Sequence, residues 1–127
     1  MSNDYEWEKR QHILSQLTNL PDGWYKTLVP NLVEDLVGIL GPYALEFKVL
    51  QSKEKFGSMR VYWTWDNWSF RDPQIDWNKM GNNIDSILHK YERISYKTCV
   101  GCGAPAVYDH DGCGYIIPLC EKCLNRT

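Results

Sequence analysis

The sequence predicts an α+β fold, in which helices pack on a small antiparallel β-hairpin and a four-cysteine zinc ribbon follows at the C-terminus. Apolar residues recur at three- and four-residue steps in the first forty residues and again after residue 76, which is typical of amphipathic helices. Between these regions they alternate with polar residues, as in strands. Two C-x2-C pairs come last. We therefore expect an α+β domain over residues 1–97 and a zinc ribbon over residues 98–127.

Two helices are expected before residue 42. The first contains Trp7 and Ile13 at helical spacing, and a turn at residues 21–23 follows it. The second helix begins near Pro30, because proline suits a first helical turn, and Gly41 with the proline after it ends the helix. The apolar face of this second helix consists of Leu32, Leu36, Val37, Ile39 and Leu40.

A β-hairpin is expected next. Residues 45–49 and 59–65 both alternate apolar and polar side chains, which is the period of two that strands show. The connection is expected over residues 52–58, where Gly57 supplies a flexible point.

A long helix is expected to begin at Asp72 and Pro73 and to end near Tyr96. Gly81 weakens this helix by about 1 kcal/mol relative to alanine. Short strands at residues 106–108 and 115–117 then form the ribbon hairpin. The apolar positions of the long helix are Trp77, Met80, Ile84, Ile87, Leu88, Tyr91 and Ile94.

Four cysteines form the strongest motif of the chain. The two C-x2-C pairs are separated by seventeen residues, a spacing typical of a structural zinc ribbon. Four thiolates complete a tetrahedron around Zn²⁺ and leave no position open for a substrate. A redox pair and two disulfides are the alternatives. We favour metal because the N-terminal residues show no signal peptide, and a reducing cytoplasm disfavours disulfides. The expected zinc ligands are Cys99, Cys102, Cys120 and Cys123.

Composition and motifs exclude several function classes. A formal net charge of −2 argues against a general binder of nucleic acid, which normally carries a basic stripe. No apolar run is long enough to span a membrane. His12, His89 and His110 are scattered without catalytic partners, and Cys113 is expected to be a loop thiol outside the metal site. We therefore expect a protein that is not an enzyme.

The predicted hairpin carries a second candidate site. Its cations attract phosphate and its aromatic faces stack on bases, so the segment predicts a site for a nucleotide-like anionic ligand. In the competing interpretation the lysines belong to a solvated turn, Arg60 pairs with Glu46, and the tryptophans belong to the core. The candidate ligand-binding residues are Lys53, Lys55, Phe56, Arg60, Tyr62 and Trp63.

Residues 53–62, Lys-Glu-Lys-Phe-Gly-Ser-Met-Arg-Val-Tyr, resemble the "KEKFG-hydrophobic-R-aromatic-Y" segment of small, uncharacterised phage and bacterial proteins. Residues 98–105 and 119–123, which hold the cysteine pairs, are similar to the zinc-ribbon tail of the same proteins. The likeness covers residues 20–124. It implies a phage or prophage origin and a cytoplasmic setting in the bacterial host cell, and it carries over no catalytic residue.

Two functions stay open from the sequence. The first is a non-enzymatic, zinc-binding phage protein that captures a nucleotide-like anionic ligand, for example a host immune signal in counter-defence. The second is a zinc-ribbon interaction module that contacts a host protein or nucleic acid through ribbon residues such as Tyr108 or Tyr115. The acidic composition disfavours an extended nucleic acid as the partner.

Overall fold

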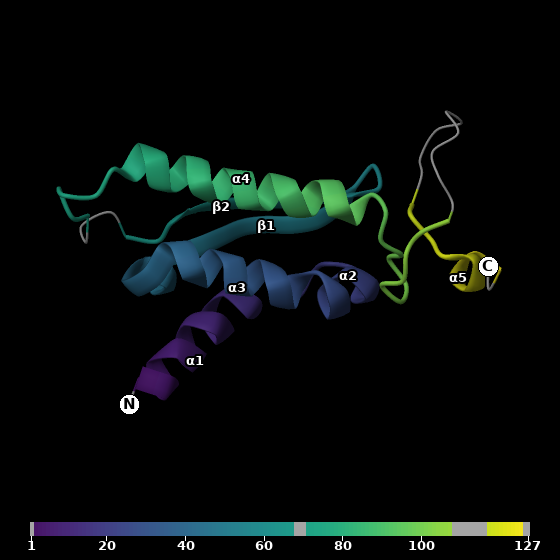
Figure 1. Cartoon of the computed structure of the whole chain (residues 1–127), viewed down its shortest axis with the longest axis horizontal. Coiled ribbons are helices and arrows are strands. Elements are labelled where there is room, and N and C mark those ends of the chain that lie inside the picture. The colour runs from purple at the N-terminus through teal and green to yellow at the C-terminus, as the bar shows by residue number, and fades with distance from the viewer. Residues whose placement is uncertain (1, 68–70, 108–116, 126–127) are drawn as a thin grey trace.

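A computed structural model describes residues 2–67, 71–107 and 117–125 of the chain. It confirms an α+β fold with a two-stranded antiparallel sheet and four cysteines clustered near the C-terminus (Figure 1). The elements in order are α1 (Ser2–Leu14), α2 (Asp22–Thr27), α3 (Val29–Leu40), the 3-10 helix η1 (Gly41–Glu46), β1 (Phe47–Lys55), β2 (Ser58–Trp65), α4 (Trp77–Ser95) and α5 (Glu121–Leu124).

The core lies where the hairpin meets α3 and α4. Figure 1 shows β1 and β2 running lengthwise between these two helices, and α3 also contacts α4 directly. Fully buried side chains come from each layer, including Leu36 of α3, Phe47 of β1 and Ile84 of α4. Helix α1 joins this core by its C-terminal end, where Ile13 is buried and His12 Nε2 lies 2.9 Å from the Phe47 carbonyl oxygen.

The pairing register of the hairpin defines an inner and an outer face. Pairs run from Phe47 opposite Trp65 to Lys55 opposite Ser58, with a bulge at Leu50, which has no partner. A bulge adds one residue to one strand only, so the side-chain alternation changes phase there. The inner face therefore carries odd-numbered residues of β1 before Leu50 and even-numbered residues after it, and its buried members are Phe47, Ser52, Met59 and Trp65.

The expected connection over residues 52–58 was wrong in length. Strand β1 continues to Lys55, and only Phe56 and Gly57 link the strands. Both have positive φ angles, of 53° and 84°, as the central residues of type I′ hairpin turns do. The bulge explains the error, because it ends the period of two that the sequence shows up to Val49.

Two helix boundaries also differ from those expected. The predicted turn at residues 21–23 instead begins α2 at Asp22. Helix α4 begins at Trp77 rather than at Asp72, because Asp76 caps it by accepting a 3.1 Å hydrogen bond from the Lys79 amide. The predicted ribbon strands are not seen at residues 106, 107 and 117, which are described and lie in no strand; their other residues, with His110 and Cys113, lie outside the described residues.

Ser95, at the end of α4, covers the free edge of β2. Its hydroxyl oxygen accepts a 2.8 Å hydrogen bond from the buried Met59 amide, and Ser95 itself is fully buried. We predict that Ser95→Ala lowers the free energy of unfolding by about 1–3 kcal/mol, because it leaves a buried N–H without an acceptor. Urea denaturation measures the change.

Ser15→Ala is the matched control for this substitution. Ser15 is exposed directly after α1, and its hydroxyl donates to the His12 carbonyl oxygen. Its removal is expected to change stability by no more than about 0.5 kcal/mol. Equal effects of the two substitutions would show that the Ser95 contact does not stabilise the hairpin edge.

Candidate functional site

The first cysteine pair lies on a tight turn directly after α4. The Cys99 amide donates to the Ala104 carbonyl oxygen at 2.8 Å, and the Gly103 amide donates back to the Cys99 carbonyl oxygen at 2.9 Å. Gly103 has a φ of +86°, which glycine adopts without strain. These bonds close the turn and hold Cys99 and Cys102 on the same side of it.

The second pair begins α5. Cys120 is the N-cap of this short helix, and its Sγ accepts a 3.4 Å hydrogen bond from the Cys123 amide. The segment before it lies beside the first turn, because the Val100 amide donates to the Pro118 carbonyl oxygen at 3.0 Å. The two pairs are thereby brought together from opposite ends of residues 99–123.

The four sulfur atoms form a compact group. All of them lie within 4.8 Å of one another, and the Cys102 and Cys120 Sγ atoms are 3.5 Å apart. Thiolates bound to Zn²⁺ at about 2.3 Å in a tetrahedron are separated by roughly 3.8 Å, so the donor set fits this ion. All four cysteines are free rather than disulfide-bonded. The prediction that these four residues come together in a position to bind a metal ion is confirmed, and zinc as the metal stays a prediction.

Protonation of the cluster is uneven. Burial opposes ionisation of Cys99, but backbone hydrogen bonds from Cys120, Cys102 and Gly101 outweigh it and lower the pKa of this thiol to about 6. Hydrogen bonds to the sulfur atoms of Cys120, Cys99 and Cys102 raise the pKa of Cys123 to about 12. Before a metal binds, the cluster therefore mixes thiolate and thiol. A metal ion must displace the remaining protons, so its affinity falls as the pH falls.

Helix α2 supports the first turn from the N-terminal side. The Gly23 amide donates to the Val100 carbonyl oxygen at 2.8 Å, and the buried Trp24 indole N–H donates to the Thr98 carbonyl oxygen at the same distance. A Cβ atom on Gly23 would lie only 2.2 Å from the Cys99 carbonyl oxygen. Sequence reasoning missed this support, because a six-residue helix gives too short a pattern to indicate what it packs against.

The structure gathers most of the predicted ligand-binding residues on the outer face of the hairpin. Lys53 lies opposite Arg60, and Lys55 and Tyr62 share that face by register. Phe56 is in the turn and is 64% exposed. Trp63 does not join them: it lies on the inner face, where its indole N–H donates to Asp85 of α4 at 2.8 Å.

Arg60 interacts with a carboxylate of α4. Its Nε lies 3.7 Å from Glu92 Oε2 and donates to the Ser58 hydroxyl at 2.9 Å, so the expected alternative partner Glu46 was wrong. Lys48 is a further cation on the outer face that sequence reasoning missed. A strict period of two places Lys48 and Lys53 on opposite faces of the strand. They share the outer face only because of the bulge at Leu50.

Comparisons of the chain with protein-family models, curated proteins and solved structures give no match. The likeness to phage proteins, the division at residue 97 and the cytoplasmic location therefore remain predictions. Among the helices that the structure describes, none combines the length and the apolar character needed to cross a membrane.

We predict that Cys102→Ser releases the bound metal and unfolds the C-terminal segment, because three thiolates cannot complete the tetrahedron. Structural zinc contributes on the order of 10 kcal/mol in isolated peptides. Elemental analysis of the purified protein measures the metal, and wild type is expected to hold about one Zn²⁺ per chain. Cys113→Ser, outside the four-cysteine spacing, is expected to retain it. A folded, metal-free wild type would contradict the prediction.

Gly23 is predicted to tolerate no side chain. Gly23→Ala drives a Cβ into the backbone of the first cysteine turn and is expected to cost about 3 kcal/mol or more, together with the metal. Gly38→Ala in α3 is the control, because no atom lies within 4 Å of the added Cβ. It should raise stability by about 0.5–1 kcal/mol. Thermal melting with parallel metal analysis distinguishes the two variants. If Gly23→Ala retained the metal, the dependence of the cysteine cluster on the α2 contact would be refuted.

Proposed function

We propose that this protein is a non-enzymatic metal-binding protein that binds a nucleotide-like anionic ligand on the outer face of its hairpin. The observation that supports this proposal is the register, which places Lys53, Lys55, Arg60 and Tyr62 on one side of the sheet. Lys55 and Tyr62 are exposed there, and the two others are half-buried. The metal centre has a structural role and lies outside this surface.

The charge of the outer face suits an anion. Lys48 adds a further positive charge, whereas Glu54 belongs to the inner face by register and its carboxylate accepts from the Gly57 amide at 2.8 Å. Glu92, at 3.7 Å from Arg60, offsets part of one charge only. Lysine and arginine form charge-assisted hydrogen bonds with phosphate oxygens, which are stronger than neutral ones.

Phe56 offers an aromatic surface beside these cations. A bulky residue with a φ of 53° is strained by about 1–2 kcal/mol, and its 64% exposure returns little burial of apolar surface. The Lys55 Nζ lies 5.7 Å from the ring centroid, so charge and ring are next to each other. The burial of Phe56 does not offset this backbone strain. The strain therefore supports a role in recognition, in which the ring stacks on a base.

The resemblance to phage proteins suggests what the ligand does in the cell. We propose that it is a nucleotide signal of the host immune response, and that the protein sequesters this signal in the host cytoplasm. The alternative, an interaction module built on the zinc ribbon, depends on Tyr108 and Tyr115, which lie outside the described residues.

A panel of cyclic mononucleotides and dinucleotides, tested by thermal shift, examines the proposal, because a ligand that binds the native state raises its apparent stability. The double variant Lys53→Ala/Lys55→Ala is expected to weaken binding by about tenfold or more through lost phosphate contacts. The affinity should also fall as salt is added, since these charges are exposed.

Two variants control this experiment. Lys26→Ala/Lys79→Ala removes the same total charge from α2 and α4 and should leave binding unchanged. Phe56→Asn should raise stability by about 1 kcal/mol, because asparagine accepts positive φ, and yet weaken binding. If no nucleotide stabilises wild type, or if both lysine pairs have equal effects, the proposed function fails.

A further inference from the structure

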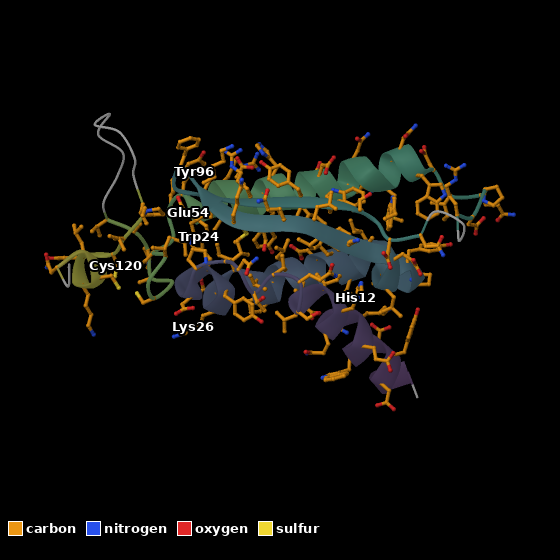
Figure 2. All side chains as sticks on the ribbon, turned by 180° about the vertical axis from the view of Figure 1, so that it is seen from behind. His12, Trp24, Lys26, Glu54, Tyr96 and Cys120 are labelled. Carbon is orange, nitrogen blue, oxygen red and sulfur yellow. The ribbon has the colours of Figure 1, made fainter. Side chains whose placement is uncertain are left out.

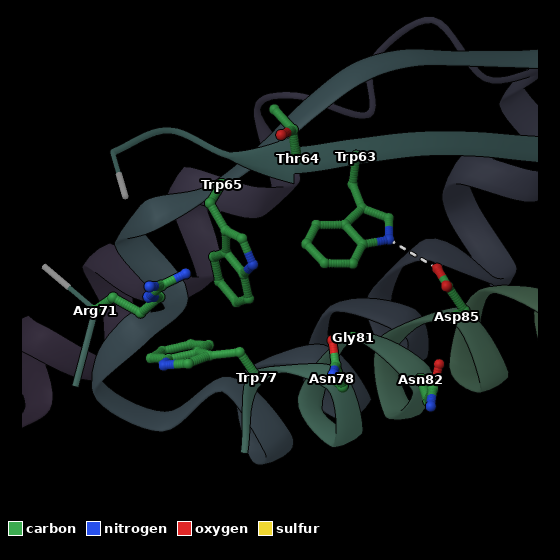
Figure 3. Close-up of a pocket in the computed structure, with 9 residues that line it drawn as sticks. All are labelled: Trp63, Thr64, Trp65, Arg71, Trp77, Asn78, Gly81, Asn82 and Asp85. Carbon is green, nitrogen blue, oxygen red and sulfur yellow. Dashed lines mark hydrogen bonds between the residues drawn. The ribbon is translucent and has the colours of Figure 1, made fainter. Parts of the chain in front are cut away.

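A cavity of about 380 Å³ lies between the end of β2 and the first half of α4 (Figure 3). It lies at the end of the hairpin away from the Phe56–Gly57 turn. Its volume falls within the range of small-molecule sites, about 300–1,000 Å³. The residues that define its chemistry are Trp63, Trp65, Trp77, Asn78, Asn82 and Asp85.

Three tryptophans form the walls, and each is held in place. Trp65 meets Trp63 and Trp77 edge to face, at centroid distances of 5.2 and 5.4 Å. Phe47 stacks on Trp63, and Tyr43 packs edge-on against Trp77. The indole N–H groups of Trp63 and Trp77 already donate within the protein, to Asp85 and to the Asp72 carbonyl oxygen. What these two side chains offer a ligand is therefore their aromatic surface.

Helix α4 supplies the polar side of the cavity. Asn78, Asn82 and Asp85 stand at i, i+4 and i+7 on one helix face, and Figure 3 shows them along the same side of α4. Within the described part of the chain, the side-chain carboxamides of Asn78 and Asn82 form no hydrogen bond. Gly81 leaves the space between them open, because a Cβ added there would only touch Trp63, at 3.9 Å.

The lining selects against charged and against purely apolar ligands. Arg71 and Asp85 lie at opposite ends of the cavity in Figure 3, so the lining has no net charge, and a ligand that fills its length with a net charge of either sign is repelled at one end. An apolar ligand would cover two carboxamides without pairing them. A flat ring with donors and acceptors on its edge satisfies both requirements, since it stacks on indole and pairs with asparagine, which presents a donor beside an acceptor.

We propose that this cavity binds the base of a nucleoside, a planar nitrogen heterocycle without net charge. Trp63 and Trp77 contact the faces or edges of the ring, and Asn78 and Asn82 pair with its polar edge. Asp85 keeps one carboxylate oxygen on Trp63 and has a second that can accept from a sugar hydroxyl. This site is separate from the outer hairpin face, and the proposal does not rest on the proposed function.

Isothermal titration calorimetry with adenosine, guanosine, cytidine and uridine tests the site, because these nucleosides carry no phosphate for the hairpin cations. We expect at least one of them to bind wild type. Gly81→Leu, which extends a side chain into the cavity, should abolish that binding. Asn78→Ala/Asn82→Ala should weaken it by about tenfold or more through loss of the edge contacts.

The controls distinguish loss of binding at this cavity from loss of folding and from binding at the hairpin site. Both cavity variants place better helix formers in α4, so thermal melting should show them at least as stable as wild type. Gly38→Ala in α3 and Lys53→Ala/Lys55→Ala should bind the nucleoside as wild type does. The proposal is overturned if no nucleoside binds, if binding survives Gly81→Leu, or if ribose and glucose bind as well as the nucleosides, which would indicate a sugar site.

Discussion

The contact between α2 and the first cysteine turn is the constraint on which the metal centre depends. Two hydrogen bonds, from the Gly23 amide and the Trp24 indole, fix residues 98–100 against the N-terminal helices, with no room for even a methyl group between them. Cys99 is consequently fully buried before any ion binds. The second cysteine pair then meets a half-site that is already fixed. A metal ion held by all four thiolates would tie the C-terminal segment to the surface that the N-terminal helices form.

The hairpin supplies two different surfaces from seventeen residues of strand. Its inner face closes the core with α3 and α4, and its outer face presents cations and Tyr62 to solvent. Figure 2 shows Glu54, near the hairpin turn, and Trp24 of α2 at the same end of the molecule as Cys120. A two-stranded sheet is marginal by itself, so the covering helices are what allow the outer face to be polar. The tryptophan cavity forms where this covering ends, because the start of α4 carries asparagine and glycine, Asn78, Gly81 and Asn82, in place of large apolar side chains.

Sequence patterns predicted the elements whose ends and periods are set by neighbouring residues in the chain. Pro30 and Gly41 bound α3 as expected, the apolar and polar side chains of β2 alternate from Met59 to Trp65, and the cysteine spacing identified the four residues that cluster in a position to bind a metal ion. The parts that were missed depend on contacts between distant segments. Gly23 looks like a turn glycine until its neighbour across the fold is known. The residues of α4 that face the tryptophans do follow a helical period, but only the packing of α4 on β2 shows what they face.

The bulge at Leu50 has a consequence for how this protein can change in evolution. Leu50 is unpaired and 61% exposed, so it contributes to neither the ladder nor the core. A chain with one residue fewer at the bulge would keep the present pairing on both sides of it, whereas a deletion far from the bulge would move the residues between the two sites to the opposite face of the sheet. The bulge therefore marks the part of β1 where a single-codon deletion is compatible with the same buried side chains.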